Sequence, residues 1–224
     1  MVQATEILLN YSNVKKNIQQ VESEAGRDRG SVELVAVGKT FGECRIKPLL
    51  EAGQRCFGEN RVQETEKKWP PMKKNFQEVE LHLIGGLQTN KARLAVQLFD
   101  VIETLDRPRL ARVLSEEVRL SGKNTSFFIQ VNTGNEEQKS GIPADKADAF
   151  IALCRDDLKL LVSGLMCIPP LGEEPSLHFA LLQKIAKRNG LENLSMGMSS
   201  DYHLAIPFGA THVRVGSAIF GDRD

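Results

Sequence analysis

Lys39 is the residue of this sequence best placed for covalent chemistry. It follows the apolar run at residues 34–37 after a single glycine, so its ammonium group stands at the edge of a dry core. Desolvation there favours the neutral amine, which is the form that attacks an aldehyde. A lysine at a strand end can also extend into solvent, and Lys39 taken alone leaves both interpretations open.

Two short segments rich in glycine and hydroxyl groups suit a phosphate. They are the stretch from Ser195 to Ser200 and the pair Gly216-Ser217. Backbone N–H groups at a helix start and serine hydroxyls are common phosphate ligands. Two turns without a ligand would give the same pattern, but the lysine on the opposite side of the barrel mouth favours a bound phosphate over empty turns.

Arg214 interrupts an apolar Val-Arg-Val run. A guanidinium is always charged and only donates hydrogen bonds. Its apolar neighbours predict a buried partner rather than a surface arginine. The four histidines, by contrast, are not grouped at the spacing of metal ligands, and we expect no metal site.

The elements that must position these residues alternate between strand and helix. Eight β-rich runs occur at residues 33–37, 55–57, 80–84, 101–103, 126–131, 159–163, 194–196 and 212–215. Helical spacing of apolar residues occurs at 5–25, 45–52, 91–98, 108–120, 144–154 and 176–189. Strands separated by helix-length connections predict βαβ units and a parallel sheet.

The pattern favours one single-domain (β/α)8 TIM barrel over residues 1–224, with an extra N-terminal helix. Eight repeats match a barrel better than an open doubly wound sheet, and neither GxGxxG nor GxxxxGK[ST] occurs. Residues 68–74, with their Trp-Pro-Pro, are predicted as a long surface loop. In a barrel the C-terminal strand ends form the mouth, which would gather Lys39 and the two Gly/Ser segments.

The composition excludes several classes of function. Lys plus Arg equals Asp plus Glu, at 29 each, which gives no electrostatic case for nucleic acid or an anionic membrane. Residues 1–20 carry three charges and do not look like a signal peptide, and no apolar run is long enough to span a membrane. The four cysteines form no CxxC pair, so we expect reduced thiols and a cytoplasmic location.

Several stretches, in this order and spacing, resemble the pyridoxal phosphate homeostasis protein family. They are residues 36–40 (AVGKT), 57–64 (FGENRVQE), 82–91 (HLIGGLQTNK), 164–166 (GLM), 194–199 (LSMGMS) and 213–221 (VRVGSAIFG). The family's fold is similar to the N-terminal barrel of alanine racemase. The resemblance implies a protein that binds pyridoxal 5′-phosphate (PLP) and hands it to PLP-dependent apo-enzymes, without rapid catalysis of its own. A closed barrel with no extra domain can stand alone as a monomer, which is the state we expect.

The resemblance also implies residue roles. Lys39 would hold PLP as a Schiff base, and Arg214 would face the pyridine nitrogen. The phosphate would be surrounded by Ser199, Ser200, Gly216 and Ser217, and the ring would be lined by Asn60, His82 and Met166. Lys139 matches a family lysine near the mouth. The sequence departs from the commonest family pattern in three places: Gly38 replaces a serine, Phe41 a second lysine and Gly86 a proline. Phe41 argues against a relay of the cofactor through paired lysines there.

A weak amino-acid racemase is the main alternative. Racemisation needs bases on both faces of the substrate carbon, and only Tyr11 and Tyr202 are available as tyrosines. In alanine racemases the second base comes from a further domain, which we do not expect in a sequence that ends at Asp224. An unprotonated ring nitrogen opposite Arg214 would be a weak electron sink, which makes transamination less favoured, although racemisation could proceed with a neutral ring.

A class I aldolase is a third possibility. Lys39 would then form the Schiff base directly with a sugar phosphate.

Overall fold

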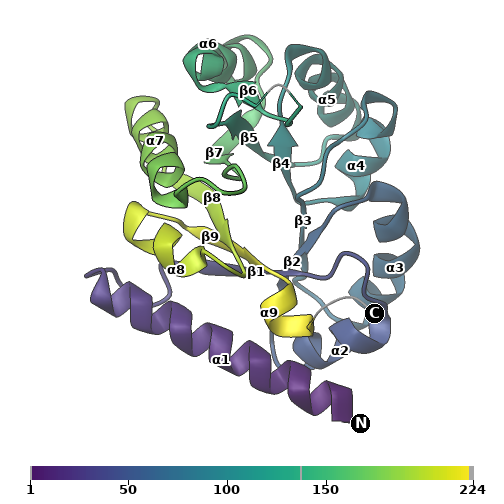
Figure 1. Ribbon diagram of the computed structural model, residues 1–224. Helices are drawn as coiled ribbons and strands as arrows, with labels where there is room; N and C mark the ends of the chain where they lie inside the picture. The colour runs from purple at the N-terminus through teal and green to yellow at the C-terminus, as the bar shows by residue number, and fades with distance from the viewer. Residues whose placement is uncertain (1, 137, 222–224) are drawn as a thin grey trace.

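A closed parallel barrel surrounded by helices is the frame of the molecule (Figure 1), in a computed structural model that describes residues 2–136 and 138–221. The barrel strands are β1 (Glu33–Val37), β2 (Cys56–Glu59), β3 (Glu80–Leu83), β4 (Val101–Leu105), β5 (Ser126–Asn132), β7 (Leu161–Met166), β8 (Asn193–Met198) and β9 (His212–Val215). They pair in the order β4-β3-β2-β1-β9-β8-β7-β5, and a β4–β5 pairing closes the barrel. The short β6 (Ile142–Pro143) pairs with β5. The predicted (β/α)8 barrel is confirmed, and an open sheet is excluded.

Each barrel strand is followed by a helix or helical turn, as the repeat predicts. The helices are α2 (Glu43–Glu51), α3 (Val62–Asn75), α4 (Ala92–Leu98), α5 (Pro108–Ser121), α6 (Ala147–Ala152), α7 (Pro175–Arg188), α8 (Tyr202–Ala205) and α9 (Ser217–Phe220). Short non-α helical turns are η1 (Thr89–Lys91), η2 (Ala144–Lys146), η3 (Leu153–Asp157) and η4 (Ile206–Phe208).

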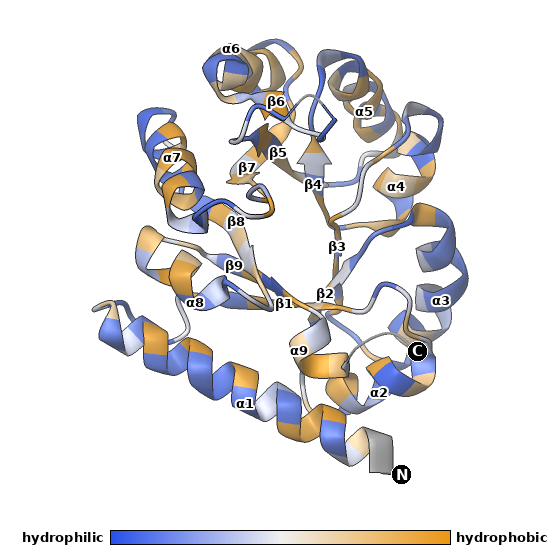
Figure 2. Ribbon diagram, in the orientation of Figure 1, coloured by the Kyte–Doolittle hydropathy of each residue, from blue (hydrophilic) through white to orange (hydrophobic). Residues whose placement is uncertain are grey.

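The leading helix α1 (Val2–Glu24) is the predicted addition to the barrel. Its residues Ile7, Tyr11, Val14 and Ile18 are buried and recur every three or four positions, which places them on one face. That face packs on the outside of the barrel, against α2, α8 and α9 (Figure 2).

Side chains alternate along the strands between two environments. In β1, Leu34 and Ala36 belong to the large apolar core between strands and helices. Val35 and Val37 are equally buried but point the other way, into the barrel, because successive strand residues face opposite sides. The interior holds polar groups as well as apolar ones, and these form the network described below.

The predicted surface loop at residues 68–74 is wrong, because α3 continues through it. Trp69 and Met72 are each 1% exposed, and their burial offsets the cost of Pro70 and Pro71 inside a helix. Each proline lacks the N–H that would bond the carbonyl four residues earlier. Those carbonyls belong to the exposed residues Glu66 and Lys67, so solvent can satisfy them.

The sixth predicted strand is displaced. The sequence predicts it at 159–163, whereas β7 runs over Leu161–Met166. Lys159 has a φ of +54°, and the N–H of Leu160 still donates to the carbonyl of Cys154. These two residues therefore close the preceding helical segment and delay the strand.

Candidate functional site

Lys39 and the start of α9 are neighbours at the mouth of the barrel. β1 pairs with β9 in the register Ala36 to Val215. Gly216 packs so closely on Val37 that a Cβ at Gly216 would lie 3.3 Å from the Val37 Cβ, and the half-buried Lys39 follows two residues later. The expectation that the lysine faces the Gly/Ser segments across the mouth is wrong, because closing the barrel pairs its first strand with its last.

The Ser199 hydroxyl forms the centre of a small donor cluster beside this turn. Its Oγ accepts from the backbone N–H of Gly216 at 3.2 Å and of Ala218 at 3.4 Å. Ser200 and Ser217 are exposed nearby in the same two segments. Two convergent amides and a hydroxyl are the kind of groups that bind a phosphate.

Gly197 determines the shape of the loop that carries Ser199. Its φ is +90°, and a Cβ there would lie 2.8 Å from the Cα of Tyr202, so a side chain is disfavoured by both conformation and space. The Asp201 carboxylate accepts from the N–H of Met198 at 2.6 Å and closes the loop.

Arg214 is buried inside the barrel and held from two sides. Its Nη1 donates to the Ser195 Oγ at 2.6 Å, and its Nη2 donates to the Cys167 carbonyl at 2.8 Å. The Ser195 hydroxyl donates in turn to Glu103 Oε2, which lies 3.8 Å from Arg214 Nη1. The predicted buried partner of the arginine is therefore a carboxylate, reached mainly through a serine.

The network continues from Glu103 toward the other end of the barrel. His82 Nδ1 lies 2.6 Å from Glu103 Oε1, and His82 Nε2 lies 3.0 Å from the partly exposed Glu80. Burial opposes a charged imidazole, but Cys56 and the two carboxylates hold the pKa of His82 well above its usual value. Burial likewise opposes the Glu103 carboxylate, yet His82, Arg214 and Ser195 lower its pKa to about 2. Two cations thus flank one buried carboxylate.

The three predicted ring-lining residues occupy different depths. Asn60 is half-buried directly after β2. Met166, the last residue of β7, is fully buried against Val101 and Phe128. His82 is also fully buried, and it connects to Arg214 through Glu103 and Ser195.

The comparisons with known proteins agree with this architecture. A family model described as alanine racemase, N-terminal domain, matches residues 9–224. A protein of Vibrio cholerae named pyridoxal phosphate homeostasis protein is 37% identical over 225 residues, covering 96% of this chain and 95% of that protein. The chain belongs to the pyridoxal phosphate homeostasis protein family.

Two solved structures extend the comparison. PipY of Synechococcus elongatus, crystallised with PLP bound, superposes with a TM-score of 0.78 at 34% identity, covering 92% of this chain and all (100%) of that chain. Alanine racemase of Bartonella henselae gives a TM-score of 0.73 at 17% identity, covering 98% of this chain and 61% of the racemase. The second likeness shows the barrel fold alone.

The departures from the common family pattern have distinct surroundings. A Cβ at Gly38 would lie 3.0 Å from both Glu59 Oε1 and the Ile46 Cδ1, so the usual serine would be crowded here. Phe41 packs on Phe220 with ring centroids 5.0 Å apart. Gly86 is exposed with open space around it.

Sequence reasoning missed Glu103 and Ser195 as partners of Arg214, and also Glu59 and Lys68, whose contacts are described below. A signal was present in the sequence for both glutamates, because Glu103 ends the predicted β-rich run at 101–103 and Glu59 lies two residues after the run at 55–57. Lys139, matched to a family lysine, pairs with Glu136 at 2.6 Å and lies 3.4 Å from the Pro169 carbonyl.

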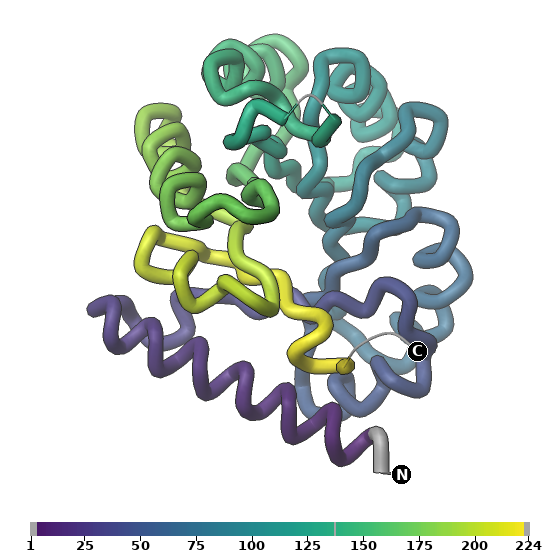
Figure 3. The backbone as a smooth tube through the Cα atoms, in the orientation of Figure 1, coloured from purple at the N-terminus to yellow at the C-terminus, as the bar shows by residue number. Residues whose placement is uncertain are grey.

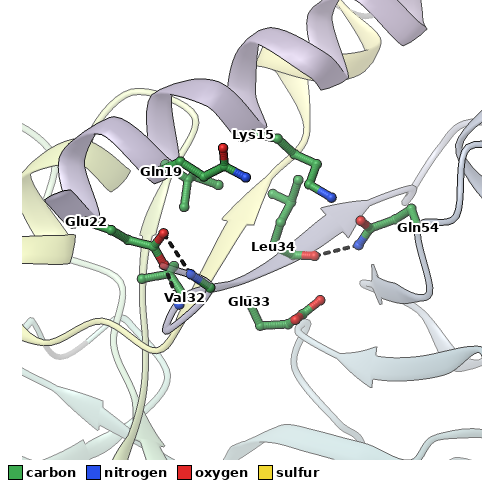
Figure 4. A pocket seen from close by; sticks show the side chains of 9 residues that line it. Lys15, Gln19, Glu22, Val32, Glu33, Leu34 and Gln54 are labelled. Carbon is green, nitrogen blue, oxygen red and sulfur yellow. Dashed lines mark hydrogen bonds between the residues drawn. The ribbon is translucent and has the colours of Figure 1, made fainter. Parts of the chain in front are cut away.

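A cavity of about 190 Å³ lies at the opposite end of β1, beneath α1 (Figure 4). Its polar groups bind backbone: the Gln54 amide donates to the Leu34 carbonyl at 2.6 Å, and Glu22 accepts from the N–H of Val32 at 2.8 Å. These contacts explain the cavity as part of the docking of α1.

Among residues 2–136 and 138–221, no group of three His, Cys, Asp or Glu side chains could hold a metal ion. None of the helices in the described part of the chain is long and apolar enough to cross a membrane.

Proposed function

We propose that this protein binds PLP covalently but reversibly at Lys39 and holds it for release to apo-enzymes in the cytoplasm. The observation that carries the proposal is the meeting of three features at one end of the barrel: the turn of Lys39, the donor cluster at Ser199, and the buried Arg214. The PLP-bound PipY structure, at 34% identity, supports the same ligand.

The residues at the mouth fit the groups of the cofactor. PLP supplies an aldehyde that condenses with a neutral lysine amine, with loss of water, and hydrolysis reverses the bond. Ser199, Ser200, Ser217 and the amides of Gly216 and Ala218 would bind its phosphate. Asn60 and Met166 would line the ring from the ends of β2 and β7, and His82 would support that surface from below.

Arg214 would face the ring nitrogen and keep it unprotonated, since a guanidinium can only donate. Glu103, with its low pKa, stabilises the arginine's charge. A pyridine ring whose nitrogen stays unprotonated withdraws electrons weakly. This property favours a protein that holds PLP over an enzyme that uses PLP for rapid catalysis.

Both tyrosines have hydroxyl partners away from the barrel interior. Tyr11 on α1 donates to Gln54 Oε1 at 3.0 Å, and the Tyr202 hydroxyl accepts from Asn17 of α1 at 3.4 Å. Neither arrangement favours a racemase, which needs a second base at the substrate carbon.

Absorbance spectroscopy of the purified protein with added PLP tests the proposal. A band distinct from free PLP should form, and borohydride reduction followed by peptide mapping should locate the cofactor on Lys39. Lys39→Ala should lose the band, with Lys67→Ala, an exposed lysine on α3, as the matched control. Reduction that labels another lysine would overturn the assignment. The aldolase is tested by incubating the protein with a sugar phosphate in place of PLP. Labelling of Lys39 on borohydride reduction would then favour that function.

Release is tested by mixing the PLP-loaded protein with an apo-enzyme. Activity of the apo-enzyme should recover faster with the loaded protein than in a control. The control contains only free PLP, at the concentration that the loaded protein releases at equilibrium. Equal recovery in the two samples would count against a delivery role. If chiral analysis showed amino-acid racemisation at enzymatic rates, the racemase would replace the delivery role as the proposed function.

A further inference from the structure

Lys68 is a second amine at this end of the barrel, and it contacts the segment that carries Lys39. Its side chain is 11% exposed. The Nζ atom lies 2.9 Å from the Lys39 carbonyl, 3.1 Å from that of Phe41 and 3.4 Å from that of Gly38. Three carbonyls of one four-residue segment therefore converge on one ammonium group.

Glu59 anchors this ammonium on the side away from the segment. Its Oε1 lies 2.6 Å from Lys68 Nζ, and the glutamate is fully buried at the end of β2. The Trp69 indole N–H donates to the same oxygen at 2.8 Å. Because Trp69 is itself 1% exposed and packs on Phe57, the carboxylate and the ammonium are held in place.

Further contacts hold the two ends of the segment, and they include the packing of Phe41 on Phe220. The N–H of Gly38 donates to the Gly58 carbonyl, and the N–H of Phe41 donates to the Gly38 carbonyl, which forms a turn. From there the chain runs outward from β1 past α3 before α2 begins at Glu43 (Figure 3). The Lys39 and Phe41 carbonyls lie on the Lys68 side of this turn, and charge-assisted hydrogen bonds are about twice as strong as neutral ones.

We propose that Lys68, anchored by Glu59, is a positioning residue for Lys39. It fixes the backbone of residues 38–41 so that the Lys39 amine stands at the barrel mouth. Without the ammonium the turn samples more conformations. The apparent affinity for PLP then falls in proportion to the fraction of molecules whose turn is in the binding conformation. The inference rests on the proposed function, because Lys39 is the anchor in both.

The test replaces Lys68 by methionine, which keeps the apolar stem and removes the ammonium. PLP affinity, measured from the absorbance band, should weaken by about tenfold or more, while borohydride still labels Lys39. Lys67→Met, the exposed neighbour on the same helix, should bind as the unaltered protein does. Lys68→Arg keeps a cation and should restore part of the affinity.

Hydrogen exchange without PLP gives a second readout. Backbone amides of residues 39–42 should exchange faster in Lys68→Met, whereas those of β1 should not change. The double variant Glu59→Gln/Lys68→Met leaves no lone buried charge, and it should show the same faster exchange if the single variant fails to fold.

The outcomes separate the two proposals. Unaltered protein that never labels at Lys39 would overturn the proposed function, and faster exchange at 39–42 would still support the positioning of the turn. Labelling of Lys39 together with unchanged affinity and unchanged exchange in the Lys68 variants would overturn the positioning role.

Discussion

At the residue scale, the barrel interior is defined by one buried carboxylate between two cations. Glu103 contacts His82 directly and reaches Arg214 through Ser195. Removing one member of such a set leaves a buried charge without a partner. The free-energy cost of that lone charge exceeds the net stabilisation that the intact set provides. The position of Arg214 therefore depends on Ser195 and Glu103, which hold it inside the barrel.

Acid stability should report on Glu103. Its pKa is lowered in the folded protein to about 2, so its contribution is present above the unfolded-state value and is lost as pH falls through the folded value. Between pH 4.5 and about 2 the free energy of unfolding should drop by about 3 kcal/mol from this group. Urea unfolding at pH 5 and pH 3 should record about 2 kcal/mol of this loss, because pH 3 still lies above the folded-state pKa.

Glu103→Gln should flatten this part of the pH profile, although it lowers stability near neutral pH. Glu66→Gln, at an exposed position on α3, should leave the profile as it is. An equal acid-induced loss in Glu103→Gln and the unaltered protein would show that other groups carry it.

At the element scale, α3 does more than cover the barrel. It supplies Lys68 to the Lys39 segment and Trp69 to Glu59, the carboxylate that anchors Lys68. It also continues through two prolines that usually end helices. The helix persists because tertiary burial of Trp69 and Met72 outweighs local propensity.

Replacing Pro71 by alanine should stabilise the protein. Pro71 is exposed inside α3, and alanine would restore an N–H donor for the Lys67 carbonyl. The gain should be about 1–2 kcal/mol, since a helix-interior proline costs about 3 kcal/mol and its stiffening of the unfolded chain returns part of that. Urea unfolding provides the measurement. Loss of stability would mean that the helix needs the proline's geometry at this site.

At the scale of the whole molecule, closure of the barrel makes the site from one chain. Strand β1 pairs with β9 and β4 with β5, so within the described residues the eight barrel strands leave no open edge for a partner strand. The groups proposed to hold PLP all belong to this chain.

We therefore predict a monomer in solution, with or without PLP. Light scattering coupled to size exclusion should give the mass of one chain. Leu171→Asp provides a check, because Leu171 is 96% exposed and is the kind of residue that a dimer would cover. A dimer mass that falls to one chain in this variant would contradict the prediction and locate the contact.

The sequence by itself determined the repeat, the barrel and the strand ends at which Lys39, Ser199 and Arg214 stand, because apolar periodicity and glycine placement are local properties. Tertiary structure decided the rest. Barrel closure placed the Ser199 cluster beside the turn of Lys39, burial made α3 helical through its prolines, and long-range packing paired Arg214 with Glu103 and the Lys39 segment with Lys68. Such contacts join residues far apart in the chain, so no local pattern encodes them.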